Sequence, residues 1–465
     1  MMQRHSIILI SGALGLVFLV AFGLFTSTVD LEYSEPVEVE PIETMELNCN
    51  TEIDKDGDNV PDNLDVKGPI DWSHCNLEGL NLSNLELSGA ILSNSNLYRV
   101  NFYNTNLSGA NLSHSILYKA NVSNTNFKYA NLSYAKLSGY GIELEGVFVD
   151  ELGRVAAFDF TGTDLSYADF NHARLFDAIL TDAIVRHTNF HHSNLSGVDL
   201  TGLDLTGTNL TKTNLTNANL TGVDLSNKDL TGTILAGADL SNANLTGVDL
   251  SGRDLTGTIL TGVDLSNKDL TGTILAGADL SNANLTGVDL SNKDLSGTIL
   301  VGVDLSGVDL SYKDLTWTIL TKTNLTNAKL VSVDLSNKDL SGTILTGADL
   351  TNANLDGVNL SGKDLTRTIL VGVDLSGKDL TGTILTGADL SNANLIDANL
   401  TDANLQNTDL RYVLLVDANL SNAILTGSDL SNAVLTGTIL TGANLENTIL
   451  INTILNCVDH PICIG

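Results

Sequence analysis

Hydrophobic residues recur along most of this chain with a period of five. A Leu, Phe or Val holds the central position of each unit from Leu77 to Leu137, and again from Phe160 to Leu455. A small residue stands two places before it, Asn or Asp one place before it, and Ser or Thr one place after it, as in Ala110-Asn111-Leu112-Ser113. This period matches neither an α-helix nor a flat β-strand. It predicts a chain that turns a corner every five residues.

The pattern resembles that of the pentapeptide-repeat proteins over roughly four fifths of the chain. The resemblance implies an all-β fold, a right-handed four-sided parallel β-solenoid with twenty residues per coil. In that fold the central residue and the small residue two before it point inward, and the other three point outward. Residues 220–251 and 260–291 are identical, an offset of two such coils, which supports the twenty-residue turn.

The arrays and their flanks predict seven segments. The interruption alternates apolar residues around Asp150-Glu-Leu-Gly153, which predicts a β-hairpin, with a bulged coil as an equal alternative. The segments are a transmembrane anchor or signal peptide (1–28), an acidic linker (29–48), a calcium-loop segment (49–76), a first array (77–138), the interruption (139–159), a second array (160–455) and a C-terminal cap (456–465).

The N-terminal region contains an apolar run of twenty residues, Ser6 to Phe25, preceded by Arg4 and His5. A helix of that length spans the hydrocarbon core of a bilayer. Arg4 predicts that the N-terminus stays in the cytoplasm. A cleaved signal peptide is the alternative. Either route predicts export, so we expect a membrane-anchored extracellular solenoid or a secreted one.

An aspartate-rich loop follows the acidic linker. Its carboxylates fall at positions 1, 3, 5, 9 and 12, and the residue at position 7 offers a backbone carbonyl. This is the ligand spacing of a Ca²⁺ loop. The segment resembles the calcium loops of thrombospondin type 3 repeats and dockerin, although Asn59 replaces the EF-hand glycine and Asp65 the terminal Glu. An acidic turn-rich linker is the alternative. The expected ligands are Asp54, Asp56, Asp58, Val60, Asp62 and Asp65.

The chain has four cysteines: Cys49, Cys75, Cys457 and Cys463. An even number in an exported chain predicts disulfides. Three connectivities are possible, and the pairs closest in sequence are Cys49 with Cys75 and Cys457 with Cys463. Zinc is less expected because no CxxC spacing occurs.

The composition excludes several function classes. The formal net charge of −32 argues against direct nucleic-acid binding, which needs a basic face. It fits a soluble surface, a cation binder or a mimic of a polyanion. We find no Ser/His/Asp set and no Gly-rich phosphate loop, and a filled solenoid offers no cleft for a substrate. The sequence therefore predicts a protein that is not an enzyme.

Two outward surfaces are candidate contacts. Tyr98 and Tyr118 are twenty residues apart, as are Arg99 and Lys119, and such a strip suits a protein or glycan partner. Stabilising aromatic stacks are the alternative. Near the C-terminus the outward positions become apolar, which predicts a homodimer contact, unless the cap covers it. These apolar residues are Val434, Ile439, Ile449 and Ile454.

Charged residues break the pattern in two ways. Eight inward small positions are basic, and we expect their side chains to reach solvent past the neighbouring Asp, or else those corners to be remodelled. A ladder of five outward carboxylates should either raise its members' pKa values or be simply solvated. The basic residues are Lys228, Arg253, Lys268, Lys293, Lys313, Lys338, Lys363 and Lys378, and the acidic ones are Asp229, Asp249, Asp269, Asp289 and Asp309.

Together these features predict a non-enzymatic, extracellular, membrane-tethered structural or adhesive rod that binds a protein and is stabilised by calcium near its base. A second hypothesis comes from the resemblance. Some pentapeptide-repeat proteins are similar in shape to B-form DNA and inhibit DNA gyrase, and the acidic charge suits such a DNA mimic. Localisation separates the two, because an exported rod does not reach a cytosolic DNA-binding protein.

Overall fold

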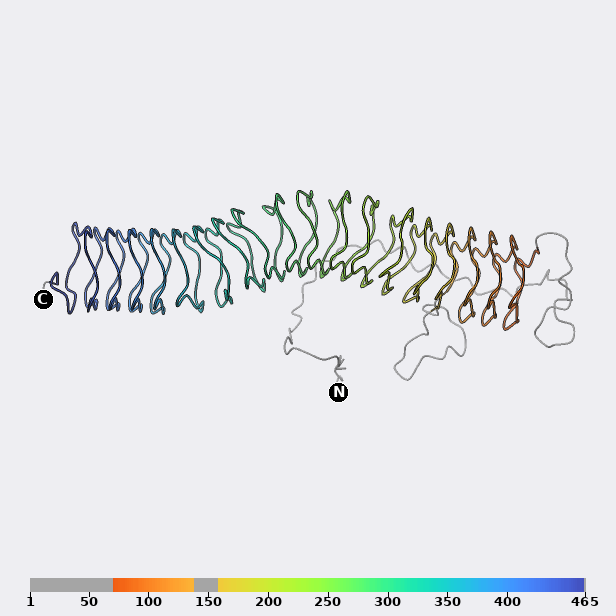
Figure 1. Ribbon diagram of the computed structural model, residues 1–465, viewed down its shortest axis with the longest axis horizontal. Helices are drawn as coiled ribbons and strands as arrows, with labels where there is room; N and C mark the ends of the chain where they lie inside the picture. The colour runs from red at the N-terminus through yellow and green to blue at the C-terminus, as the bar shows by residue number, and fades with distance from the viewer. Residues whose placement is uncertain (1–69, 138–157, 464–465) are drawn as a thin grey trace, which may run out of the picture. The chain divides into compact units, whose positions relative to one another are not determined.

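The computed structural model describes residues 70–137 and 158–463, which wind into one four-sided β-solenoid (Figure 1). Its regular structure consists of single-residue parallel bridges, which outside the interruption and the C-terminal end join residues twenty places apart, as in Asn81↔Asn101 and Asn101↔Asn121. Neither a helix nor a longer strand occurs in these two ranges. The prediction of an all-β repeat solenoid is confirmed.

Each five-residue unit encodes its own corner. The N–H of Ala110 donates to the carbonyl of Leu107 (3.0 Å), and Gly109 between them has φ of 66°. A positive φ at this place defines a type II turn and explains why Gly or Asn recurs there. The side chain of Asn111 then accepts the N–H of Ser113 (3.1 Å), which holds the start of the next corner.

The inward positions form the core. Central leucines such as Leu112 and small residues such as Ala110 are fully buried. Thr is accepted at the small position because its hydroxyl reaches a backbone carbonyl of the preceding coil, as Thr438 Oγ1 does with Leu415 (2.6 Å). Side chains therefore fill the interior of the coils.

The two predicted arrays belong to one continuous solenoid. Asn126 bridges to Asp164 and Asn131 to Asp169, so the register passes across the interruption with a step of 38 instead of 20. The predicted hairpin or bulged coil falls on residues 138–157, outside the described residues. The coil resumes at Phe158, whose ring lies 4.7 Å from that of Phe160.

The solenoid begins earlier than the repeat pattern indicates. Asp71 bridges to Ile91, Trp72 takes the central position, and Cys75 is buried at the small position. Cys75 is disulfide-bonded. The predicted anchor, the linker, the Asp54–Asp65 loop and Cys49 lie outside the described residues.

The C-terminal segment lies against the last coil. Val458 bridges to Ile439, and its N–H donates to the carbonyl of Thr438 (2.8 Å). A disulfide joins Cys457 to Cys463, and Ile462 packs against the core. This arrangement covers backbone groups that an end coil would otherwise expose.

Candidate functional site

The basic residues at inward positions turn into the solenoid instead of out to solvent. Lys293 is only 8% exposed, and its Nζ donates to the backbone carbonyls of Leu270 and Thr273 in the preceding coil. Lys338 Nζ donates in the same way to Thr318 (3.0 Å). The expectation that these side chains reach solvent past the neighbouring Asp is therefore wrong for Lys293. Carbonyls of the preceding coil also accept the Nζ of Lys228, Lys268, Lys313, Lys363 and Lys378.

Each basic corner opens the two sides of the coil that flank it. On either side of Lys293, neither Asp289 nor Asp294 bridges to the preceding coil, and the same loss occurs at the other seven basic corners. The reason is that Lys293 Nζ takes the carbonyl of Thr273, which the N–H of Asp294 would otherwise use. We call such an unbridged gap between successive coils an open seam.

Closed seams follow the last basic corner, Lys378. Bridges there run without interruption from Asp379↔Asn399 to Ile439↔Val458. In Figure 1 the coils of this blue part are stacked regularly, whereas those of the green middle part are less regular. A long side chain at the small position therefore separates neighbouring coils locally.

Cavities of the solenoid lie at open seams. One of about 590 Å³ lies beside Lys293, between residues 267–274 and 287–294. Another of about 480 Å³ lies in the next seam, between residues 285–291 and 304–309. A third, of about 530 Å³, is lined by Lys228. The surface of this solenoid is hollowed where its bridges are missing.

The outward aspartate ladder stays ionised. The hydroxyl and the backbone N–H of Thr271 donate to Asp269 (N···Oδ1 2.8 Å) and lower its pKa, and repulsion from Asp249 offsets this only in part. Local hydrogen bonds thus outweigh like-charge repulsion. The expectation of raised pKa values is wrong, because the pKa is lowered at Asp229, Asp249, Asp269, Asp289 and Asp309.

The predicted tyrosine strip forms, but one of its rings is not accessible. The rings of Tyr98 and Tyr118 stack at 5.8 Å, with Arg99 4.9 Å from the first ring centroid and Lys119 Nζ 5.3 Å from the second. Tyr118 is 1% exposed, and burial raises its pKa. Tyr118 is therefore covered and not accessible to a partner, and the pair has the geometry of a stabilising stack.

Two longer aromatic columns follow neighbouring corners, and of these a spacing of twenty between identical residues in the sequence indicates only the pair His172 and His192. In one column His114, Tyr134, His172 and His192 stack with centroids 4.5 to 4.7 Å apart. In the other, Tyr129, Tyr167 and His187 stack at 4.6 to 4.8 Å. The second column ends where His187 lies over Gly207, since a Cβ there would be 2.1 Å from its Nδ1. A comparison of residues one coil apart in the sequence would have found both columns, provided that the interruption between the two arrays was first taken out of the count.

We expect the histidine column to weaken in mild acid. Burial, followed by repulsion from neighbouring histidines and Lys212, lowers the pKa of His172 and of His192. As the pH falls through about 6.5, these histidines take up protons in the unfolded chain before they do so in the folded one. The free energy of unfolding that the neutral histidines contribute above that pH is therefore lost below it. Thermal melting between pH 7.5 and 5 measures this loss, and it should be smaller in the His172→Asn/His192→Asn variant. An equal loss in both proteins would contradict it.

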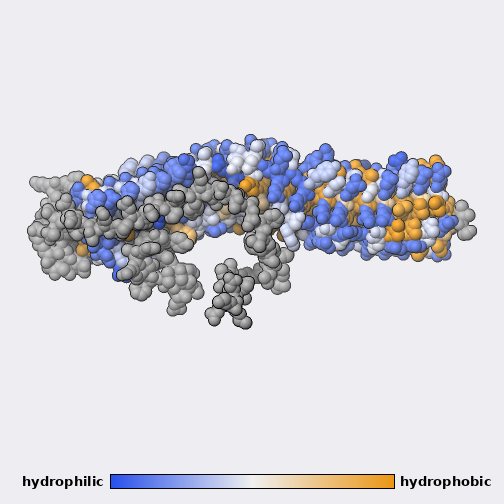
Figure 2. Space-filling model, turned by 180° about the vertical axis from the view of Figure 1, so that it is seen from behind, coloured by the Kyte–Doolittle hydropathy of each residue, from blue (hydrophilic) through white to orange (hydrophobic). Residues whose placement is uncertain are grey.

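The apolar residues near the C-terminus are exposed (Figure 2). Ile439, Ile449 and Ile454 are 36%, 44% and 48% exposed, and Val434 is half-buried. Val434 bridges to Ile454 and to Leu414, so these three residues form one strip on one side of the solenoid. The C-terminal segment leaves this strip uncovered.

Within the described part of the chain, no cluster of three or more His, Cys, Asp or Glu side chains is arranged to hold a metal ion. The same ranges contain no helix that is long and apolar enough to cross a bilayer. The expected calcium ligands and the apolar Ser6–Phe25 run lie outside these ranges.

Comparison with known families identifies the repeat. The model of the family described as pentapeptide repeats matches residues 73–139, 159–227, 229–411 and 414–452, well over half of the chain. The chain belongs to the pentapeptide-repeat family. Among curated proteins, none matches it.

Several solved structures of pentapeptide-repeat proteins are similar to this chain. Rfr23 from the cyanobacterium Cyanothece 51142 is 42% identical over 21% of this chain and 64% of its own, with a TM-score of 0.16. HetL from Nostoc sp. strain PCC 7120, a protein involved in heterocyst differentiation regulation, is 28% identical over 60% of this chain and 91% of its own (TM-score 0.16). QnrB1, a plasmid-mediated fluoroquinolone resistance protein, is 23% identical over 47% and 93% (TM-score 0.17). Because these TM-scores are low, family membership rests on the matched repeats.

Proposed function

We propose that this protein is a non-enzymatic rod that binds a protein partner through its solenoid, is tethered to a membrane by its N-terminal helix, and lies outside the cytoplasm. A calcium-loaded loop, Asp54–Asp65, stiffens the join between the linker and the first coil. Two intramolecular disulfides cover the ends of the solenoid.

The observation that carries this proposal is the filled interior. Leu, Ala, Val and Thr side chains occupy the inward positions of the described coils. Catalytic sites need a concave pocket with converging polar groups. The described solenoid instead offers long outer sides that are hollowed at its open seams, the kind of surface on which repeat proteins bind other proteins. The tether is supported by the length of the Ser6–Phe25 run.

Protease treatment of intact cells tests the location. We expect the protein in the membrane fraction, and its solenoid should be cleaved by protease added outside. Recovery of an intact solenoid in the cytosol would exclude the tethered extracellular rod.

Calcium binding is expected at the aspartate loop. Calorimetry on the full-length protein should show one site that Asp56→Ala removes, because position 3 supplies a carboxylate ligand. Asp30→Ala is the matched control, since it removes the same charge from the linker and should leave the site intact. The absence of heat from the wild type at millimolar calcium would contradict this prediction.

The exposed apolar residues near the C-terminus, on the strip and on the neighbouring side that carries Ile449, support a homodimer. Sedimentation of the anchor-free protein should show a dimer that Ile449→Asp and Ile454→Asp convert to a monomer. Ile384→Asp changes an outward isoleucine that is 40% exposed and distant from the C-terminus, and should leave the dimer unchanged. A wild type that is monomeric at tens of micromolar would count against the strip as a contact.

A second candidate function is DNA mimicry. The ladder from Asp229 to Asp309 repeats once per coil and stays ionised, which gives one side of the solenoid a row of fixed negative charges. Such a row suits a DNA-binding protein such as gyrase. Cytosolic recovery of the solenoid in the protease experiment, together with binding to gyrase, would favour this function.

A further inference from the structure

The open seam beside Lys293 exposes unpaired backbone groups on both of its edges. It separates residues 269–272 of one coil from residues 289–291 of the next. In the closed seam between residues 389–392 and 409–411, Leu390 N–H donates to Asp409 (2.8 Å), Asp409 N–H to Ala388 (2.9 Å) and Asn392 N–H to Arg411 (3.0 Å). The equivalent N–H groups in the open seam, those of Leu270, Asp289 and Gly272, have no protein acceptor in the described chain.

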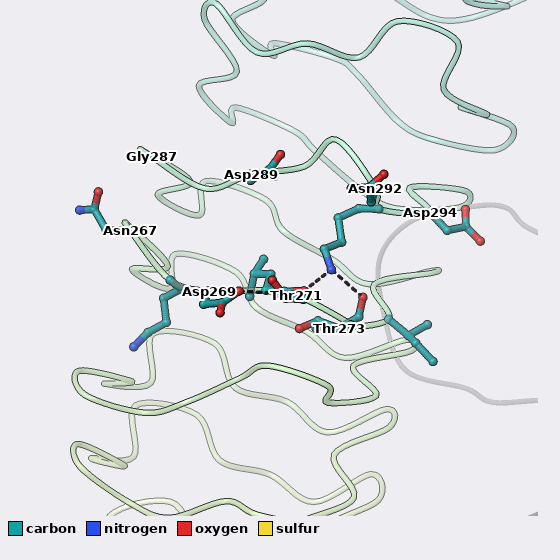
Figure 3. A pocket seen from close by; sticks show the side chains of 13 residues that line it. Asn267, Asp269, Thr271, Thr273, Gly287, Asp289, Asn292 and Asp294 are labelled. Carbon is teal, nitrogen blue, oxygen red and sulfur yellow. Dashed lines mark hydrogen bonds between the residues drawn. The ribbon is translucent and has the colours of Figure 1, made fainter.

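The cavity of about 590 Å³ fills this seam (Figure 3). Lys293 Nζ donates across the seam to the carbonyls of Leu270 and Thr273. Figure 3 shows Asp269, Thr271 and Thr273 on one coil and Asp289 and Asp294 on the other. The seam is thus held open by the protein's own lysine. Its unpaired donors and acceptors border a space that a chain segment can enter.

The lining of the cavity is acidic. Asp269, Asp289 and Asp294 border it. Its two lysines donate to backbone carbonyls, Lys293 to Leu270 and Thr273, and Lys268 to Val248 (3.0 Å). Three carboxylates against two ammonium groups leave this lining with a net charge of −1, and Lys293 lies close enough to Asp269 and Asp289 to help lower their pKa values. A ligand with positive charge is favoured.

We propose that this open seam is a docking site for an extended, basic peptide segment of a protein partner. The peptide adds as a β-strand, its backbone pairs with the free groups of the two coils, and its Lys or Arg side chains meet the flanking carboxylates. The free backbone N–H groups favour a peptide over a metal ion or a polyamine. Either of those cations binds only the carbonyls and carboxylates and leaves the N–H groups of Leu270 and Asp289 unpaired. This inference rests on the proposed protein-binding role and names the chemistry of the partner.

Hydrogen exchange on the full-length protein tests the site directly. The probe is a capped hexapeptide of alternating Val and Lys. We expect it to slow exchange of the Leu270 and Asp289 amides at least tenfold. A backbone N-methylated peptide of the same charge, spermine and Ca²⁺ should not do so. Equal protection by these three compounds would mean binding by charge alone and would overturn the proposal, as would the absence of protection by the hexapeptide at saturation.

Two variants that each remove one positive charge distinguish peptide binding in the open seam from non-specific attraction to the acidic surface. Lys293→Thr makes the protein more acidic, so non-specific attraction predicts tighter peptide binding. The open-seam proposal predicts that Thr closes the gap, as Thr408 does at its own corner, where Asn404 and Asp409 both bridge to the preceding coil, and that the number of bound peptides falls. Lys322→Asn removes the same charge from an exposed outer corner and should leave binding unchanged. Unchanged peptide stoichiometry in Lys293→Thr would refute the seam as the site, while the location of the rod in cells would be unaffected.

Discussion

The backbone amides of Leu270 and Asp289 are expected to exchange hydrogen about a thousandfold faster than those of Leu390 and Asp409, since protected core amides open with free energies of several kcal/mol and each 1.4 kcal/mol is tenfold. The four residues occupy equivalent places in two seams of the same side of the solenoid. Leu390 and Asp409 are bonded across a closed seam, whereas Leu270 and Asp289 have no acceptor. Residue-resolved exchange of the native protein measures this difference.

Two variants test whether Lys293 causes the difference in amide exchange rates. Lys293→Thr should bring Leu270 and Asp289 to the slow rates of their counterparts, because the Thr hydroxyl takes the Leu270 carbonyl and lets the coils approach. Thr408 is the precedent: its Oγ1 donates to Leu385 (2.9 Å), and Leu385 N–H donates to Asn404 (2.7 Å). Lys322→Asn should change neither amide. If all four amides exchange equally slowly in the wild type, the seam is closed in solution and the role assigned to Lys293 is wrong.

The five-residue period was sufficient to predict a corner in every unit, while the four-sided coil and its inward positions came from the family resemblance. Leu112 and Ala110 are buried and Gly109 has a positive φ, each in the place that the pattern assigns. The first corner, within residues 70–76, was missed because Trp72 and Cys75 take the places of Leu and Ala. A pattern defined by residue type overlooks an unusual residue that fills the same inward volume.

The open seams could not be predicted from the repeat pattern, because they depend on contacts with groups in the preceding coil. Lys293 finds acceptors in Leu270 and Thr273, and only the stacked coils bring those carbonyls within reach. The same holds for Tyr118, whose burial depends on what packs over it. The aspartates show the converse, since the hydrogen bonds of Asp269 come from Thr271, two residues away, and were available in the sequence. Contacts within one five-residue unit can be predicted from the repeat pattern. Contacts between residues of successive coils can be found only once the coils are stacked in the structure.

If a long basic side chain opens a seam, then placing one in a closed region should open it. Ala393 is fully buried, and the sides flanking its corner carry four bonds: Asp389 N–H to Thr368 (2.9 Å), Leu370 N–H to Asp389 (2.7 Å), Asn394 N–H to Val373 (3.0 Å) and Leu375 N–H to Asn394 (2.7 Å). In Ala393→Lys the ammonium group needs the carbonyls of Leu370 and Val373, as Lys293 needs those of Leu270 and Thr273. Losing these bonds, offset by the new lysine bonds, should destabilise the local structure by about 2–4 kcal/mol.

That loss is measured at the amides themselves, because a long solenoid opens locally and a single global unfolding free energy does not describe it. Leu375 and Asn394 should exchange about thirtyfold to a thousandfold faster in Ala393→Lys. Ala393→Thr is the control, since Thr is accommodated at the same position in many coils, for example at Thr383 and Thr408, and its hydroxyl has the Leu370 carbonyl within reach. It should leave both amides protected. If the lysine variant keeps them as slow as the threonine variant does, length and charge at the inward position are not what separates the coils.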